Sequence, residues 1–262
     1  MNMPRTVFGF HAVQARLRAD VSSVLEIFLD ETREDARARD LLALAEDRGV
    51  KVMRVPSKRL DGFCGGERHQ GVVARVKERA KREGLEDLLD RLTEPALLLV
   101  LDGVTDPHNL GACLRVADAA GVHAVIAPKD RAAGIGATVA KVASGAAETM
   151  PYYMVTNLAR TLDDLKDRNI WVVGADERTP QTLYAADLPA SMAWVLGAEG
   201  EGMRRLTRER CDVLVRIPMQ GSVASLNVSV ASGICLFESR RRRLEAGVRA
   251  VPAVTGHRRT KG

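Results

Sequence analysis

The spacing of hydrophobic positions in this chain changes near residue 95. Ahead of that point apolar runs are short, and an amphipathic segment is followed by Gly49, a common helix stop. The pattern predicts two helices and three strands, at 10–17 and 33–48, and at 24–29, 50–55 and 70–76. Glycines and charges at 61–71 (DGFCGGERHQG) indicate an exposed loop. This part of the chain is therefore expected to form a small α/β unit.

Continuous apolar runs alternate with helical segments after residue 95. The predicted strands lie at 96–101, 122–127, 152–155, 170–175, 192–196 and 213–217. The predicted helices lie at 110–120, 135–143, 158–167, 203–210 and 226–243. Fully apolar strands that alternate with helices are typical of an α/β fold with a mostly parallel sheet and helices on both faces.

Dense charge of both signs separates the two parts, at 77–94. As a helix it would be polar on nearly every face except one stripe, which contains Leu85, Leu88 and Leu92. Such a segment is typical of a linker or an exposed helix. The division that we expect is a small domain at 1–76, a charged linker at 77–94, a larger domain at 95–243 and a basic, disordered tail at 244–262.

Composition narrows the class of protein. The chain has 262 residues, of which 46% are hydrophobic and 28% charged, a balance typical of soluble globular proteins. No apolar run approaches the roughly 20 residues of a membrane span, and residues 1–20 hold no apolar stretch of signal-peptide length. We therefore expect a cytoplasmic protein. The four cysteines form no CxxC pair and have no histidine at ligand spacing, so neither zinc nor a disulfide framework is expected.

The positive charge is concentrated at the C-terminal end. The net charge is +5, yet residues 240–262 alone hold eight Arg and Lys against one Glu. The run RRRR at 240–243 ends a predicted helix, where cations also complement the helix dipole. Two interpretations of this segment remain open, namely a solvated helix end with a tail, or a surface that contacts phosphates.

Three polar, glycine-rich segments stand beside apolar runs that predict buried strands. The first, 106–115 (DPHNLGACLR), places Asn109 at an expected helix N-cap, with Gly121 as the matching stop. Arg115 lies six residues further on, from where its long side chain can reach back to the same site as Asn109. Judged alone, the two residues are equally compatible with a simple cap and a surface ion pair.

The second segment, 196–203 (LGAEGEGM), has three glycines that let the backbone pass close to a ligand. Its glycine order differs from the dinucleotide-binding pattern GxGxxG. Glu199 lies among the glycines, where it can bind hydroxyls or a positively charged group. The alternative is a tight turn that carries an exposed acid.

The third segment, 217–230 (IPMQGSVASLNVSV), joins an open loop to a helix rich in small residues. Ser225 is an N-cap candidate, and Asn227 follows in the expected first turn. The helix face that starts at Val228 can pack against the sheet or against a partner subunit. His108 in the first segment has no partner histidine or acid pair, which makes it a weak candidate base.

Taken together, the motifs NLGACLR, LGAEGEGM and IPMQGSVASLNVSVA resemble those of the SpoU (TrmH-like) family of S-adenosyl-L-methionine-dependent RNA ribose 2′-O-methyltransferases. They occur in the family's order and at suitable spacing. FGFHAVQARLR and HQGVVARV also resemble the ends of the ribosomal-protein-like RNA-binding domain in the RlmB-like branch. That branch methylates a guanosine ribose in large-subunit (23S) ribosomal RNA.

This resemblance implies a role for each matching position. The implied catalytic residues are Asn109, Arg115, Glu199, Ser225 and Asn227. Backbone groups that would hold the methyl donor belong to Leu196, Gly197, Ile217, Met219 and Leu226. The expected RNA contacts are Arg68, His69, His108 and Arg115. The resemblance further implies a C-terminal trefoil knot (SPOUT type), a homodimer, ribosomal RNA as partner and no metal.

Two other functions remain open at this point. One is the same reaction on a transfer RNA, and the other is a non-catalytic RNA-binding or ribosome-assembly protein. The intact polar set at Asn109, Arg115, Glu199 and Asn227 disfavours the second. The group that accepts the hydroxyl proton is also open, because a guanidinium such as that of Arg115 is effectively always protonated. We expect Arg115 to hold a phosphate and to stabilise developing alkoxide charge.

Overall fold

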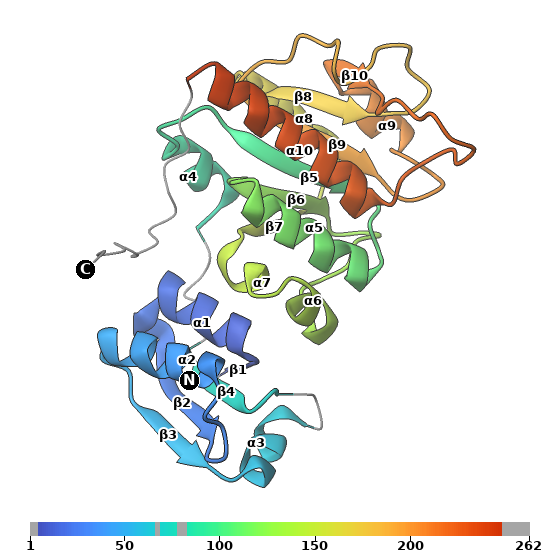
Figure 1. Cartoon of the computed structure of the whole chain (residues 1–262). Helices are drawn as coiled ribbons and strands as arrows, with labels where there is room; N and C mark the ends of the chain where they lie inside the picture. Colours follow the sequence, from blue (N-terminus) through green and yellow to red (C-terminus); the bar gives the residue numbers. More distant parts are fainter. Residues whose placement is uncertain (1–4, 66–68, 78–82, 248–262) are drawn as a thin grey trace.

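A computed structural model describes residues 5–65, 69–77 and 83–247 and contains two separate β-sheets, each with its own hydrophobic core (Figure 1). The first sheet has four strands in the order β1-β4-β2-β3. Their bounds are β1 Arg5–Phe8, β2 Val24–Asp30, β3 Val52–Val55 and β4 Val72–Val76. β4 pairs antiparallel with β1 and β2, and β2 pairs parallel with β3.

Helices cover both faces of this small sheet. They are α1 Phe10–Ala19, α2 Ala36–Asp47 and α3 Ser57–Cys64, with a 3-10 turn at Val21–Ser23. α1 and α2 contribute to one core cluster and α3 to a second. The predicted loop at 61–71 is therefore wrong in its first half. Leu60 and Cys64 give α3 a buried face, and the helix stops only at Gly65, whose φ of 58° is left-handed.

The second sheet has six strands in the order β10-β8-β9-β5-β6-β7, and every neighbouring pair is parallel. Their bounds are β5 Leu97–Asp102, β6 Ala124–Pro128, β7 Tyr152–Val155, β8 Trp171–Ala175, β9 Met192–Gly197 and β10 Val213–Val215. This confirms the α/β class with a parallel sheet. The knot stays a prediction.

Seven helices accompany the second sheet in the described residues: α4 Leu85–Asp90, α5 Pro107–Ala119, α6 Ala137–Val142, α7 Ala146–Thr149, α8 Leu158–Asp167, α9 Arg205–Glu209 and α10 Val228–Glu245. α5, α6, α7 and α10 share one core cluster, and α4 and α8 share the other, so both sheet faces are covered. Leu88 of the predicted stripe is buried in the second cluster. None of the helices in the described part of the chain is both long and apolar enough to cross a bilayer.

The two parts meet where α1 packs against α7. The contact centres on Glu148 of α7, which is 2% exposed. Its Oε1 accepts a hydrogen bond of 2.9 Å from Arg5, and its Oε2 lies 3.7 Å from Nη1 of the buried Arg16. A buried carboxylate costs free energy unless it is paired, and here both cations come from the small sheet and its helix. Glu148 therefore ties the two parts together.

Candidate active site

The three motif segments meet at the carboxyl ends of the strands of the large sheet. The second and third segments line a cavity of about 190 Å³ next to the ends of β8 and β9, and the first contacts them through Asn109. Seven of the predicted site residues line it: Leu196, Gly197, Glu199, Ser225, Leu226, Ile217 and Met219. Ligands of open α/β sheets bind in this position, because the loops that follow parallel strands gather at one edge.

Gly197 ends β9 in a turn that only glycine can make. A Cβ on Gly197 would lie 2.0 Å from the carbonyl carbon of Gly202 and 2.1 Å from the nitrogen of Met203. The N–H of Gly202 closes the turn by donating to the oxygen of Ala198 at 2.9 Å. The backbone thus folds tightly on itself and forms one wall of the cavity.

A buried acid anchors this turn to the neighbouring strand. Asp102, at the end of β5 and 1% exposed, accepts hydrogen bonds from the backbone N–H of Arg204 at 2.9 Å and from its Nε at 2.6 Å. Nη1 of Arg204 also donates to Asp130 at 3.1 Å. Sequence reasoning missed Arg204. The available signal was an aspartate at the end of a fully apolar strand, which needs a buried partner.

Asn109, Glu199 and Asn227 form a single hydrogen-bonded group, although they come from three segments. Asn109 Nδ2 donates to Glu199 Oε1 at 3.2 Å, and Asn227 Nδ2 donates to Asn109 Oδ1 at 2.9 Å. Asn227 Nδ2 also donates to Glu199 Oε1, and the N–H of Val228 approaches the same oxygen at 3.3 Å. The carboxylate of Glu199 is thus fixed by three donors, and it holds both amides in place.

The structure corrects the predicted cap of the first motif. α5 begins at Pro107, and its N-cap is Asp106, whose side chain accepts from the N–H of His108 at 3.0 Å. Proline suits the first helical position because that N–H has no intrahelical partner. Asn109 therefore lies within the first turn, with its amide free to reach Glu199. The predicted stop is confirmed by Gly121, whose φ is 68°.

The third motif is corrected in the same way. The N-cap of α10 is Asn227, which accepts from the N–H of Ser229 at 2.9 Å and from its hydroxyl at 2.6 Å. Asn227 thus serves as cap and as donor at once, because its Oδ1 accepts the cap bonds while its Nδ2 donates to Asn109 and Glu199. Ser225 lies before the helix, in the loop that lines the cavity.

Arg115 lies on α5 outside the cavity wall. It is exposed, and its Nη1 donates to the hydroxyl of Ser144 at 3.4 Å. Asn109 precedes it by six residues on the same helix. The guanidinium is therefore exposed, and most of its donors stay available for a bond outside the protein.

A second charged group, which sequence reasoning also missed, follows β8 at the opposite side of the cavity. Asp176 is 7% exposed and accepts from Arg178 Nε and Nη2, both at 2.9 Å, and from Arg208 Nε at 2.5 Å. Hydrogen bonds from Arg178 lower the pKa of the Asp176 carboxyl well below its usual range. The acid stays ionised and fixes two guanidinium groups near the cavity.

Three of the four cysteines offer no activated thiol. Burial raises the pKa of Cys113 to about 11 and the pKa values of Cys211 and Cys235 to about 12. A nucleophilic cysteine needs the opposite shift. Among residues 5–65, 69–77 and 83–247 there is also no group of three or more His, Cys, Asp or Glu side chains that could hold a metal ion.

The other residues predicted to contact RNA are Arg68, His69 and His108, and their surroundings differ. Arg68 lies outside the described residues. His69 uses both ring nitrogens within the protein, since Nδ1 accepts from the N–H of Gly71 at 3.0 Å and Nε2 lies 3.0 Å from Asp61. His108 is exposed beside Asn109. Phe63 of α3 packs on Phe28, with ring centroids 4.7 Å apart, and so packs against the core of the small sheet.

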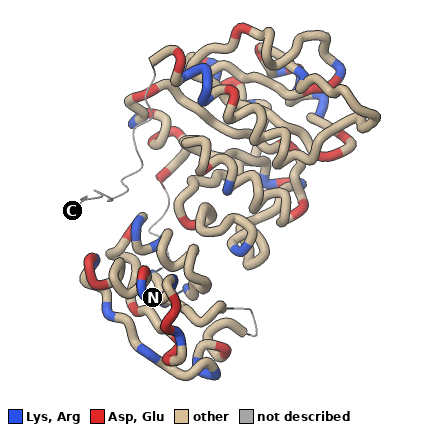
Figure 2. The backbone as a smooth tube through the Cα atoms, viewed as in Figure 1, with Lys and Arg blue, Asp and Glu red and all other residues tan. Residues whose placement is uncertain are grey.

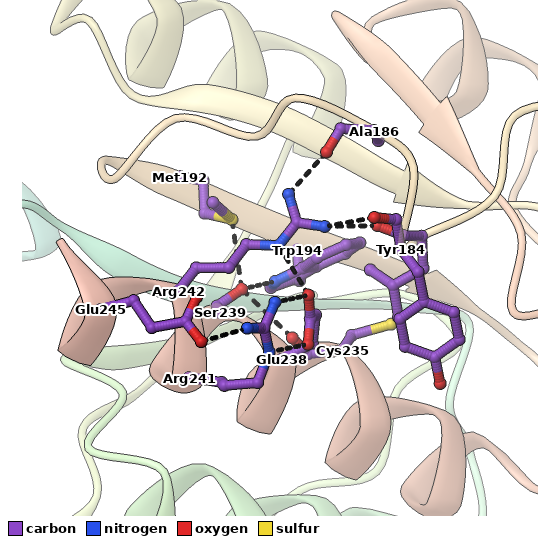
Figure 3. A network of polar contacts seen from close by, with 11 residues as sticks. Tyr184, Ala186, Met192, Trp194, Cys235, Glu238, Ser239, Arg241, Arg242 and Glu245 are labelled. Atoms are coloured by element: carbon purple, nitrogen blue, oxygen red, sulfur yellow. Dashed lines mark hydrogen bonds and ion pairs between the residues drawn. The ribbon is translucent and has the colours of Figure 1, made fainter.

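The arginines at 240–243 bind the protein itself, which neither interpretation of the sequence anticipated. Figure 3 shows two of them, Arg241 and Arg242, with their partners. Arg240 donates to the carbonyl of Ala120 at 2.7 Å, and Arg243 donates to that of Ala96 at 2.6 Å. Arg241 and Arg242 both pair with Glu238. Charges of both signs are interspersed over the described chain (Figure 2). Residues 248–262 of the predicted tail lie outside the described residues.

Comparison with known proteins gives consistent results over nearly the whole chain. Residues 96–237 match the SpoU rRNA Methylase family, and residues 6–81 match the family described as RNA 2'-O ribose methyltransferase substrate binding. A relative from Ralstonia nicotianae, the 23S rRNA (guanosine-2'-O-)-methyltransferase RlmB, is 60% identical over 93% of this chain and 98% of its own length.

Solved structures share the architecture. A crystal structure of an RNA 2'-O ribose methyltransferase has a TM-score of 0.75 and 28% identity, over 93% of this chain and 90% of that one. The SpoU methyltransferase AviRb from Streptomyces viridochromogenes, solved in complex with the cofactor AdoMet, has a TM-score of 0.72 and 26% identity, over 92% and 91%. With both sequence matches and the fold in agreement, this chain belongs to the SpoU rRNA methylase family.

Proposed function

We propose that this protein transfers a methyl group from S-adenosyl-L-methionine to the ribose 2′-hydroxyl of a guanosine in 23S ribosomal RNA. The observation that supports this most is the contact of Asn109, Glu199 and Asn227 beside a glycine-walled cavity. These groups present amide donors and acceptors suited to a hydroxyl. The relatives' activity on 23S ribosomal RNA favours this target over a transfer RNA.

The cavity suits the methyl donor. Gly200 and Gly202 both have left-handed φ angles and line it, and at either position a Cβ would meet open space. The backbone is therefore accessible to a ligand along this wall. Leu196, Met219 and Leu226 provide apolar surface for an adenine ring, while Glu199 adds an acceptor. We assign donor binding to the cavity on this basis.

The chain's own residues would perform the chemistry by positioning and charge stabilisation. When bound, S-adenosyl-L-methionine supplies a methyl group already activated on its sulfonium. Asn109 and Asn227, fixed by Glu199, would orient the ribose hydroxyl. Arg115 would hold the neighbouring phosphate and stabilise negative charge that develops on the 2′-oxygen.

We assign residues 1–76 to RNA binding, 95–243 to methyl transfer and 77–94 to the link between them. Each of the two larger parts has its own sheet and core in the described residues, which supports the division. α4 lies within the link and packs on the second core, so part of the link is fixed to the larger part.

We also propose a homodimer that forms through α10. The helix face that includes Ser232 and Cys235 is buried against its own sheet. The opposite side exposes Val230 at 50%, Phe237 at 50% and Leu244 at 61%. Residues seven apart fall on one helical stripe, and such a stripe is normally covered by a partner.

A ribosomal RNA substrate further favours activity in the cytoplasm.

The function is tested with purified protein, S-adenosyl-L-methionine tritiated on the methyl group, and unmodified 23S ribosomal RNA transcribed in vitro. We expect one methyl group per RNA, on a guanosine ribose, which makes the adjacent phosphodiester resistant to alkali. Transfer RNA serves as the control substrate. Label on a base, or label only in transfer RNA, would contradict the proposal.

A further inference from the structure

A second cavity lies between the two parts of the molecule and is larger than the candidate active-site cavity, at about 300 Å³. One wall comes from the small sheet and α1 and includes Arg5, Gly9 and His11. The opposite wall comes from α6 and the turn before α7 and includes Lys141 and Ser144. Neither part alone would form this groove.

The groove reaches the candidate active site through one hydrogen bond. Ser144 lines it and accepts from Nη1 of Arg115 at 3.4 Å. Ser144 has a left-handed φ of 50°, which is uncommon for a residue with a side chain. The catalytic candidate Arg115 therefore contacts a residue of the groove wall, although it does not line the groove itself.

The charge of the groove is positive. Its acid, Glu148, is buried and is held by Arg5 and Arg16. Lys141 is exposed, and within the described part of the chain it takes part in no ion pair. His11 is exposed on the opposite wall. An unpaired lysine in a concave surface attracts anions.

We propose that this groove is a binding site for the ribose-phosphate backbone of the RNA next to the methylated nucleotide, with Lys141 as the principal phosphate contact. The inference rests on the proposed function, since it names the path of that substrate. Glu148 acts as a positioning residue, because its pairs with Arg5 and Arg16 hold the two walls together. The groove thereby links RNA capture to delivery of the ribose at Arg115.

Binding measurements at several salt concentrations test this proposal in the full-length protein. Lys141→Ala is compared with wild type in filter binding to in vitro transcribed 23S ribosomal RNA. We expect the Kd to rise about tenfold and the slope of log K against log salt to fall by about 1, because one phosphate contact is lost. Lys141→Arg should keep most of the affinity, since it preserves the charge.

The matched control is Lys166→Ala on α8, which packs on the other face of the sheet and outside the groove. It should leave both Kd and salt slope unchanged. Binding of S-adenosyl-L-methionine by Lys141→Ala would show that the variant is folded. Wild-type affinity and salt slope in Lys141→Ala would overturn the groove as a phosphate site.

Photo-crosslinking provides the second measurement. Ala137→Cys, on the wall of the groove, is labelled with an azidophenacyl group and irradiated with the RNA. We expect crosslinks within a few nucleotides of the methylated guanosine. Crosslinks only at distant sites, or none, would refute the inference while wild-type methylation of the same RNA still supported the proposed function. A wild type without methyl transfer would instead reject the proposed function.

Discussion

At the scale of single residues, the candidate site depends on the fixed orientation of a few amide and carboxylate groups. Glu199 accepts from Asn109, Asn227 and the N–H of Val228, so it has little freedom to rotate. Such a group needs no movement when substrate arrives, which is how a preorganised site lowers a barrier. Arg115 lies outside this group, and among the described residues its one side-chain hydrogen bond is to Ser144.

Arg115 is the sharpest test at this scale. Arg115→Lys keeps the charge but loses the planar fork that matches a phosphate, so we expect kcat to fall by about 100-fold or more, as for loss of a charge-stabilising donor. For Arg115→Ala, kcat should fall by at least as much. Methyl transfer is measured at saturating RNA and methyl donor. Donor affinity should stay unchanged, because Arg115 does not line the cavity. Near-native kcat in either variant would disprove the role.

At the scale of elements, α10 is held by arginines that act as anchors. Arg240 donates to the carbonyl oxygen of Ala120, the C-cap residue of α5, through Nε at 3.0 Å and Nη2 at 2.7 Å. Arg242 donates to Leu183 at 2.9 Å and to Ala186 at 2.5 Å in the segment before β9. The same helix carries the Asn227 cap, so these bonds also fix the end of the candidate site.

Arg240→Ala should therefore reduce stability. It removes two charge-assisted bonds to a helix C-terminal carbonyl, and we expect the free energy of unfolding to fall by about 1–3 kcal/mol. The matched control is Arg205→Ala on α9, whose bond to Glu209 is an exposed i, i+4 pair. That change should cost less than about 0.5 kcal/mol. Urea unfolding compares the two, and equal losses would contradict the anchoring role.

The pH dependence of the same helix gives an independent measurement. Hydrogen bonds from Arg241 and Arg242 lower the pKa of Glu238 from its ordinary 4.5 to about 2. A depressed acid pKa stabilises the fold above the unfolded pKa, and this contribution disappears as the pH falls through the folded pKa. The stability difference between wild type and Glu238→Gln should be full at neutral pH and shrink between 4.5 and about 2. A difference independent of pH would refute this linkage.

At the scale of the whole molecule, two separately cored sheets are joined by the buried Glu148 contact and by the segment that contains α4. The arrangement leaves one apolar stripe on α10 exposed, at Val230, Phe237 and Leu244. It also creates a groove that neither part has alone. The packing of the two parts within the chain therefore creates the surface that we propose for RNA, and the stripe is the surface that we propose for a second copy.

The proposed dimer is tested by sedimentation of wild type and Phe237→Glu. A charge in the stripe should oppose its burial, so the variant should sediment as a monomer while wild type sediments as a dimer. Trp171→Glu, also at an exposed apolar residue but on β8, is the control and should remain dimeric. A wild-type monomer, or a Phe237→Glu dimer of native stability, would exclude the α10 interface.

The amino-acid sequence by itself predicted the fold class and most of the elements, but it missed β1, α3 and α7. Tyr152–Val155 and Leu158–Asp167 lie where apolar periodicity predicts them, because burial of one face of a strand or helix is a local property. The motifs also identified the family, since their residue types and order are readable without coordinates. The sequence predicted the starts of helices less reliably, since the N-cap of α5 is Asp106 and not Asn109.

Only the tertiary structure decided which distant groups meet. Asn109 reaches Glu199 and Asn227 because the strand order places β9 beside β5, and no local period encodes that order. The sequence shows only a basic run at 240–243, whereas in the folded chain these arginines bind backbone carbonyls and a carboxylate of the protein itself. The groove beside Lys141 exists only because α1 packs on α7. Each of these depends on contacts between segments far apart in the chain, which sequence spacing does not fix.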